Sequence, residues 1–294
     1  MGICYGNGKL IKKNEKKAFI WFMRSATAGY TKGQYNLGYC YERGKGTDKN
    51  ETKAFEWYLK SAESGDGMGQ TNLGLLYLYG KGIDKNETKA FKWFMKSAIS
   101  GCVDGQCNLG YCYEHGKGTD KNETKAFEWY LKSAESGDGI GQNNLGLLYL
   151  YGKGVDKNET ETFKWFMKSA ISGCADGQCS LGYCYVNGIG TDKNEIKGFE
   201  WYMKSAIAGC TEGQYSLGVF YEYGIGTEKN ETRAFECYLK LAEKGYAKAQ
   251  NKLGKCYEYG IGIHKNNNEA IIWYKKAYDN GIEAAKDKLN VILP

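Results

Sequence analysis

The chain has 294 residues, of which 42% are hydrophobic and 25% charged, with a formal net charge of +6. This composition is typical of a soluble protein with a sizeable apolar core, and the mild charge, with no Lys/Arg block, argues against a nucleic-acid-binding protein. No apolar run approaches the roughly 18 residues needed to span a bilayer. The N-terminus also has no secretory hydrophobic segment, so we expect no membrane insertion and a cytoplasmic location.

A repeat of 36 residues runs through the chain without insertions. The ten-residue string KNETKAFEWY is identical at 49–58 and 121–130, 72 residues apart, so two adjacent repeats form a duplicated cassette. A period between 20 and 50 residues indicates a solenoid or a propeller. The pair Leu-Gly recurs at Leu37, Leu73, Leu109, Leu145, Leu181, Leu217 and Leu253. The Trp residues share another register, in which Cys237 replaces one Trp: Trp21, Trp57, Trp93, Trp129, Trp165, Trp201 and Trp273.

The first full repeat begins with a predicted helix, which we call helix A. Gln34, Leu37, Gly38 and Tyr41 are spaced i, i+3, i+4 and i+7, which is one face of a helix. Gly44 is placed to end that helix, because a helix commonly ends at a glycine in the left-handed conformation. The aromatic residues follow a period of 3.6 and do not alternate, so the repeat contains no strand signal.

A second helix, helix B, follows a Gly-rich turn and extends to about Ser64, before Gly65. Asn50 is placed as its N-cap, which also explains the Asn-x-Thr sequon there without glycosylation. Ala54, Trp57, Tyr58, Ser61 and Ala62 form its buried stripe. Each repeat is therefore an antiparallel helix pair, and the pairs are predicted to stack into an α/α superhelix.

The helix-A motif LGxxY and the helix-B motif KAFxWYxKSAxxG resemble the Sel-one-like repeat family, a close relative of the tetratricopeptide repeats. The resemblance covers essentially the whole chain and implies an all-α, right-handed α/α superhelical solenoid. Most repeats open with Gly-Gln, as at Gly33, where the family usually has Ala, so we expect helix A to start less firmly. We expect one array with partial repeats at 1–32 and 285–294 and full repeats at 33–68, 69–104, 105–140, 141–176, 177–212, 213–248 and 249–284.

The array has no evident capping repeats. Met1-Gly2 lies on the Leu-Gly register, and residues 285–294 begin another helix A without a partner. The chain is then a piece of a longer protein, or its ends fray, or they pair with other molecules. Self-association through the uncapped ends is thus one expected kind of partner.

In tetratricopeptide-like stacks helix A lines the concave side, so the resemblance implies that residues opposite the Leu-Gly-Tyr face line a groove. Tyrosine-and-acid repeats alternate there with leucine repeats, a chemistry that suits an extended peptide or a partner helix. The alternative is that the leucines pack between neighbouring helices and bind nothing. A charge at Leu147 is expected to abolish partner binding with little change in melting temperature. The predicted groove residues are Tyr35, Tyr39, Glu42, Leu75, Leu78, Tyr79, Tyr111, Glu114, Leu147, Leu150, Tyr151, Tyr183, Tyr215, Glu222 and Tyr223.

The 11 cysteines do not form a regular pair in each repeat. One helix-A position holds Cys4, Cys40, Cys112, Cys184 and Cys256, and in the intervening repeats Leu76, Leu148 and Phe220. This alternation of small and large residues is expected of interlocking core positions, so we predict reduced thiols that act as small apolar residues. Two pairs five residues apart are the only ones placed to form bridges: Cys102 with Cys107, and Cys174 with Cys179.

The sequence gives little support for metal binding or catalysis. Cys107, Cys112 and His115 offer zinc ligands, but they are spread around one helix. The only other His, His264, lies in a distant repeat, and no Ser/His/Asp set recurs. We therefore expect no metal, no cofactor and no catalytic residues, and hence no enzyme activity.

The sequence and the resemblance together favour a non-enzymatic scaffold or adaptor, for example in signalling, that binds a peptide or partner helix. The resemblance leaves two alternatives open. One is a subunit of a luminal quality-control and degradation complex of the endoplasmic reticulum, with glycosylated sequons at Asn50, Asn86, Asn122, Asn158 and Asn230. The other is a cell-wall-active enzyme or an activator of a cell-wall synthase.

Overall fold

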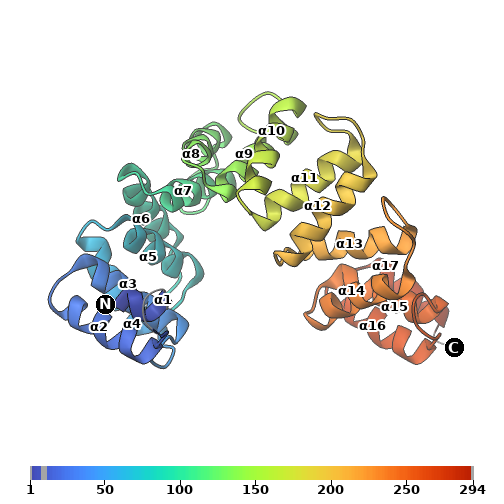
Figure 1. The fold of residues 1–294 in the computed structure, drawn as a ribbon, viewed down its shortest axis with the longest axis horizontal. Helices are drawn as coiled ribbons and strands as arrows, with labels where there is room; N and C mark the ends of the chain where they lie inside the picture. Colours follow the sequence, from blue (N-terminus) through green and yellow to red (C-terminus); the bar gives the residue numbers. More distant parts are fainter. Residues whose placement is uncertain (1, 8–11, 293–294) are drawn as a thin grey trace. The chain divides into compact units, whose positions relative to one another are not determined.

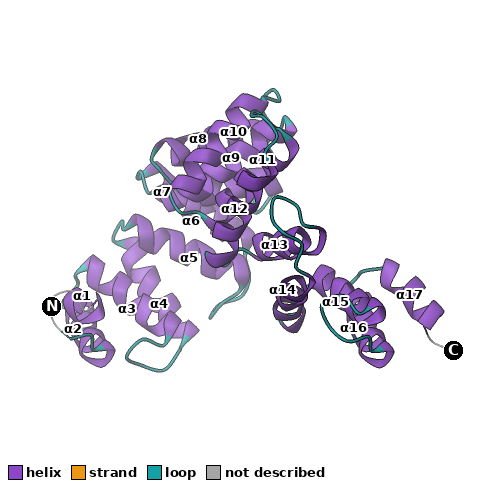
Figure 2. Ribbon diagram, turned by 45° about the vertical axis from the view of Figure 1, so that its right-hand side comes forward, coloured by secondary structure: helices purple, strands orange, loops and turns teal. Residues whose placement is uncertain are grey.

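The computed structural model describes residues 2–7 and 12–292, and all regular elements in these ranges are α-helices (Figures 1 and 2). The predicted all-α fold is confirmed. The helices are α1 (Gly2–Asn7), α2 (Glu15–Thr27), α3 (Thr31–Arg43), α4 (Glu51–Glu63), α5 (Gly67–Tyr79), α6 (Glu87–Ile99), α7 (Val103–His115), α8 (Glu123–Glu135), α9 (Gly139–Tyr151), α10 (Glu159–Ile171), α11 (Ala175–Asn187), α12 (Glu195–Ile207), α13 (Thr211–Tyr223), α14 (Glu231–Glu243), α15 (Ala247–Tyr259), α16 (Asn267–Asp279) and α17 (Ala284–Ile292). Met1, which the uncapped-start prediction invoked, lies outside the described residues.

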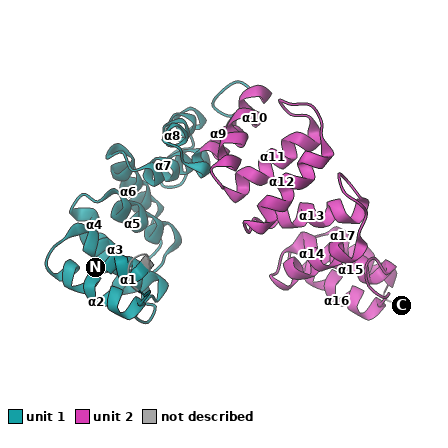
Figure 3. Cartoon of the chain, in the orientation of Figure 1, with its two compact units in different colours: residues 1–141, 152–156 teal, residues 142–151, 157–294 magenta. Residues whose placement is uncertain are grey.

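The helices alternate along the chain as predicted, with helix A carrying odd numbers and helix B even numbers. The chain divides into two compact units, residues 1–141 with 152–156 and residues 142–151 with 157–294 (Figure 3). Within each unit, a helix A packs most extensively on the helix B that follows it and next on the helix B that precedes it. Consecutive helix pairs therefore share helices as packing partners, which is the solenoid arrangement.

A capping asparagine explains where each helix B begins. The Asn50 side-chain oxygen accepts a hydrogen bond of 2.9 Å from the Lys53 backbone N–H, and Asn86, Asn122 and Asn158 cap their helices in the same way. These bonds satisfy a backbone donor that the first helical turn leaves without a partner. The predicted helix start at the sequon is thus confirmed.

The glycine near the start of helix A serves close packing. α3 begins at Thr31, two residues before Gly33, and its N-cap residue Tyr30 makes no side-chain cap hydrogen bond, so the expected less firm start stays a prediction. A Cβ atom on Gly33 would lie 2.4 Å from the Ser25 hydroxyl oxygen of the preceding helix B. The same clash recurs between Gly69 and Ser61. In these repeats glycine therefore lets helix A approach the previous repeat, whereas α15 has Ala249 at the position.

The Leu-Gly and cysteine positions form the core. Leu37, Leu73, Leu109, Leu145, Leu181 and Leu253 are 0% exposed. Cys112 and Cys184 are also 0% exposed, and burial raises the pKa of each thiol to about 12. These thiols remain protonated near neutral pH, so they behave as the small apolar residues that the sequence predicted.

Candidate functional site

The predicted groove residues fall into three classes of exposure; together they are called the helix-A surface below. The tyrosines at 79, 151, 183 and 223 are the exposed class, with 59%, 65%, 44% and 60% of their area accessible. The buried members are Leu78, Leu150 and Glu222. The half-buried members are Tyr35, Tyr39, Glu42, Leu75, Tyr111, Glu114, Leu147 and Tyr215. A partner could thus reach the tyrosines, while the role of the whole set stays a prediction.

The leucines contribute to the core more than the groove prediction assumed. Leu78 is 5% and Leu150 is 9% exposed, and Leu150 belongs to an apolar cluster with Phe166 and Leu181. Leu147 packs against that same cluster. Open apolar pockets at Leu78 and Leu150 are therefore not present. A charge at Leu147 would also cost stability, contrary to the expected unchanged melting temperature, because it would bury a charge against apolar side chains.

The acidic members accept hydrogen bonds from helix-B tyrosines of the same repeat. The Tyr58 hydroxyl donates to Glu42 at 2.9 Å, and Tyr130 donates to Glu114 at 3.1 Å. Where helix A carries Leu78 instead, the helix-B residue is Phe94, which has no hydroxyl and is 0% exposed. A buried hydroxyl needs an acceptor, so the acid and the tyrosine occur together.

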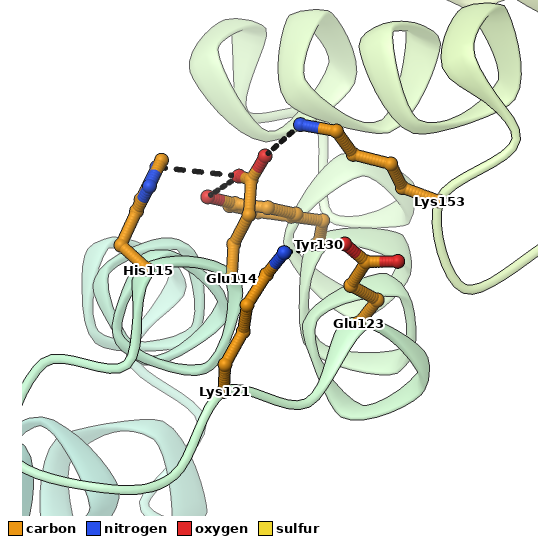
Figure 4. Close-up of polar contacts among 6 residues, drawn as sticks. All are labelled: Glu114, His115, Lys121, Glu123, Tyr130 and Lys153. Carbon is orange, nitrogen blue, oxygen red and sulfur yellow. Dashed lines mark hydrogen bonds and ion pairs between the residues drawn. The ribbon is translucent and has the colours of Figure 1, made fainter.

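Glu114 shows this arrangement most fully (Figure 4). Its carboxylate accepts the Tyr130 hydroxyl on one oxygen, and Lys153 Nζ of the next repeat lies 3.4 Å from the other. His115 Nε2 approaches the carboxylate at 3.6 Å, and the side chain of Glu114 is 14% exposed. Burial and the neighbouring carboxylate raise the pKa of Tyr130, so its hydroxyl stays protonated as the donor. The cluster joins α7, α8 and the loop after α9.

Lys121 and Glu123, also drawn in Figure 4, form a separate ion pair at 2.7 Å at the start of α8. The hydrogen bond from Lys121 lowers the pKa of Glu123. The Lys121 side chain is 59% exposed, so the pair contributes little to stability. It lies at the exposed start of α8.

A second acidic cluster lies in the other unit. Glu222 accepts hydrogen bonds from Tyr238 at 2.6 Å and from Lys252 Nζ at 2.8 Å. Burial acts to raise the pKa of Glu222, but the two donors outweigh it and the pKa is lowered. Lys252 also lies 5.1 Å from the ring of Tyr223, a cation–π distance. The cluster therefore holds a charged acid–lysine pair beside an exposed tyrosine.

Sequence reasoning missed the helix-B tyrosines and the lysines of these clusters. Tyr58 was assigned only to the buried stripe, and Tyr130, Lys153 and Lys252 were assigned to no site. One signal was present: helix B alternates Tyr and Phe in step with the Glu and Leu of helix A. Tyr202 breaks the rule, since Val186 stands in the acid position, and its hydroxyl shares a hydrogen bond with the Ser216 side chain instead.

One cysteine contact differs from the two candidate bridges named from the sequence. Cys102 and Cys174 are free thiols, as the prediction of reduced cysteines expects, so neither of the two pairs placed to form a bridge is bridged. Instead, the Cys179 thiol donates a hydrogen bond to Cys210, which precedes α13 and also accepts the Gly213 backbone N–H at 3.5 Å. The hydrogen bond from Cys179 lowers the pKa of Cys210 to about 7, as expected of a thiolate stabilised at a helix N-terminus.

Metal binding and membrane insertion can also be assessed from the described residues. Within residues 2–7 and 12–292, no three His, Cys, Asp or Glu side chains come together as metal ligands, so the Cys107, Cys112 and His115 alternative gains no support. Over the same ranges, every helix is too short or too polar to cross a membrane.

Comparison with known proteins identifies the repeat. The Sel1 repeat model matches residues 1–30, 31–66, 67–102, 103–138, 139–174, 175–210, 211–246 and 247–282. Its borders keep the 36-residue period and lie two residues before the predicted ones. A search of curated proteins gave no significant match.

Three solved structures of similar fold are described here, and two of them are described as having this repeat. A Sel1 repeat protein from Oxalobacter formigenes is 27% identical with a TM-score of 0.70, over 99% of this chain and 84% of that one. The protective antigen c5321 of uropathogenic Escherichia coli is 27% identical with a TM-score of 0.51, over 99% and 78%. Immunity protein Pa5087 of Pseudomonas aeruginosa, 16% identical with a TM-score of 0.52 over 72% and 81%, shares the fold.

Proposed function

The chain belongs to the Sel1 repeat family, and on this basis we propose that it is a non-enzymatic scaffold that binds a peptide or helix of a partner protein on its helix-A surface. Sel1 repeat proteins generally mediate protein–protein interaction, and their fold is typically a non-enzymatic interaction scaffold. A role in signalling and a cytoplasmic location are part of the proposal.

The exposed tyrosines carry the proposal. Tyr151 and Tyr223 end their helices A with 65% and 60% of their area accessible. Tyr79 stands at the same position in another repeat, 59% exposed. Tyrosine combines a large apolar ring with a hydrogen-bonding hydroxyl, and it is enriched among the residues that dominate binding energy at interfaces. A ring repeated at one position along the array suits an extended partner segment, which contacts several repeats in succession.

The test compares protein capture by two variants of one unit. The double variant Tyr151→Ala/Tyr223→Ala removes two exposed rings. Because both are exposed, we expect the free energy of unfolding to change by no more than about 0.5 kcal/mol. The control is Ile171→Ala, which removes an apolar side chain that is 72% exposed at the end of a helix B. Partners found by mass spectrometry with the wild type and the control should be lost with the double variant.

A purified partner then allows a quantitative check. Binding isotherms should show an affinity at least about 30-fold lower for the double tyrosine variant, the size expected for a residue that dominates an interface. The Ile171 control should bind within about twofold of the wild type. Equal affinities for all three proteins would refute the helix-A surface as the binding site.

The compartment has its own test. The free thiols Cys102 and Cys174 suit a reducing compartment, and each sequon Asn is already used as a helix cap. Glycosidase treatment of the native protein should leave its electrophoretic mobility unchanged. A mobility shift would favour the luminal alternative.

A further inference from the structure

One repeat lacks the tryptophan that packs the outer side of every other helix B from α2 to α16. Cys237 stands at this position in α14. In α12 the equivalent residue, Trp201, packs against an apolar cluster that includes Ala170 and Leu181. One repeat later the corresponding residues are Ala206 and Leu217, which face a cysteine instead of an indole ring.

The space of the missing ring stays open. A cavity of about 310 Å³ is lined by Ala206, Ile207, Leu217, Cys237 and Lys240, among others. Leu217 is half-buried, although six leucines at the same position in other repeats are 0% exposed. Ala206 is likewise half-buried, whereas its equivalents Ala170 and Ala242 are 3% and 2% exposed. The loss of one ring has thus exposed two residues that are otherwise core.

The cation that accompanies the ring is still present. In six other repeats a lysine three residues after the Trp lies over its ring, and in α2 an arginine, Arg24, lies over Trp21. Lys204 is 3.9 Å from the Trp201 ring, and Lys168 is 4.1 Å from that of Trp165. Lys240 occupies this position in α14 with no ring beneath it. A cation over an aromatic face is attractive by about 0.5–1 kcal/mol at exposed sites.

We propose that the socket formed by Ala206, Ile207, Leu217, Cys237 and Lys240 receives an aromatic side chain, tryptophan above all, from a partner protein. The residues equivalent to its walls, such as Ala170 and Leu181, pack against the indole ring of a tryptophan in another repeat. Burial raises the pKa of the Cys237 thiol, so the socket presents a neutral sulfur. Ile207, 82% exposed, supplies further apolar area at the opening.

A side chain fits this socket better than a free aromatic molecule. The volume of the socket is at the lower limit of about 300 Å³ for small-molecule sites, and the socket is open to solvent. A free molecule would bear the whole entropic cost of association on one ring, whereas a side chain shares that cost with the rest of an interface. The inference rests on the proposed protein-binding function, but it concerns helix-B residues and not the helix-A surface.

The test uses single-residue probes, so it needs no identified partner. N-acetyl-tryptophanamide, N-acetyl-leucinamide and indole are titrated into the full chain, and amide shifts of Ile207, Gly209 and Leu217 are followed by NMR. We expect saturable shifts with N-acetyl-tryptophanamide and at least about fivefold weaker binding of the leucine probe. The variant Lys240→Met should weaken binding of the tryptophan probe by about two- to fivefold, the size of an exposed cation–π contact.

Two variants close the socket from within. Cys237→Trp restores the ring found in other repeats, so it should abolish the shifts and raise the melting temperature. Cys237→Leu fills part of the space without a ring and serves if the Trp variant does not fold; it should weaken the probe severalfold. Both variants keep the helix-A tyrosines, so loss of the tyrosine-dependent partner and loss of socket binding are distinguishable.

Four outcomes would overturn the proposal. These are no saturable shifts with the tryptophan probe, equal binding of the leucine probe, shifts that persist in the Cys237→Trp variant, or binding of indole without binding of N-acetyl-tryptophanamide. The last outcome would mean that the socket admits free aromatic molecules and excludes a ring attached to a backbone.

Discussion

Replacing Glu114 by Leu should destabilise the chain, and adding Tyr130→Phe should recover most of that loss. Tyr130 is 0% exposed, and its hydroxyl donates to Glu114 at 3.1 Å. The double variant reproduces the Leu and Phe combination that the chain itself carries at Leu150 and Phe166, where both side chains are buried. The prediction therefore tests whether acid and tyrosine form one energetic unit.

The magnitude follows from what each change leaves behind. In Glu114→Leu the Tyr130 hydroxyl loses its acceptor while remaining buried, which costs about 1–3 kcal/mol. The ion pair with Lys153 is also lost, but the lysine side chain is 41% exposed, so this adds at most about 1 kcal/mol. Removing both partners together leaves no unsatisfied hydroxyl and is nearly neutral. We expect a coupling energy of about 1–2 kcal/mol between the two positions.

The assay is a double-mutant cycle by urea denaturation of wild type, both single variants and the double variant. Repeat arrays need not unfold in one step, so hydrogen exchange of α7 and α8 amides is followed in parallel. The matched control is Leu150→Ala/Phe166→Ala with its single variants, an apolar pair in which no hydroxyl is left unsatisfied. Its coupling reflects only shared packing.

Additive losses in the Glu114 and Tyr130 cycle would refute the reasoning. If the double variant is as unstable as the sum of the single variants, the hydrogen bond does not link the two positions. A Glu114→Leu variant as stable as the wild type would refute it as well, because a buried hydroxyl would then tolerate the loss of its acceptor.

Three further outcomes are expected. Mild oxidation with diamide, which removes two electrons and two protons from a pair of thiols, should link Cys179 to Cys210, and peptide mapping that finds Cys179 linked elsewhere would contradict the observed contact. Because the folded-state pKa of Glu222 is lowered, its contribution to stability is present above the unfolded pKa of about 4.3 and is lost as pH falls below it; the melting temperatures of wild type and Glu222→Gln should therefore differ at pH 7 and converge near pH 3, and a constant difference would count against this. Asn122→Ala should cost about 1 kcal/mol in urea denaturation by removing a helix cap, and Asn122→Asp, which keeps the cap, should cost little.

The sequence by itself determined the elements of this protein and their order. The spacing of Leu37, Gly38 and Tyr41 predicts helix A, and Asn50 and Gly44 mark helix ends that the structure confirms. These features are local: a helical face repeats every 3.6 residues, and a cap acts within one turn. The alternation of Cys and Leu in the core was also readable, because a strict 36-residue period aligns equivalent positions.

Only the tertiary structure decided which helix-A residues remain accessible. Leu150 is buried because residues of the same and the next repeat cover it, and the partner that neutralises Glu114 is Lys153, 39 residues further along the chain. Cys179 contacts Cys210 and not the nearer Cys174 for the same reason. Packing between repeats sets these neighbours, and the side-chain directions that create them depend on how closely the helices approach. A period in the sequence shows which positions are equivalent, but side chains from adjacent repeats must be placed together before one can see which of them face solvent.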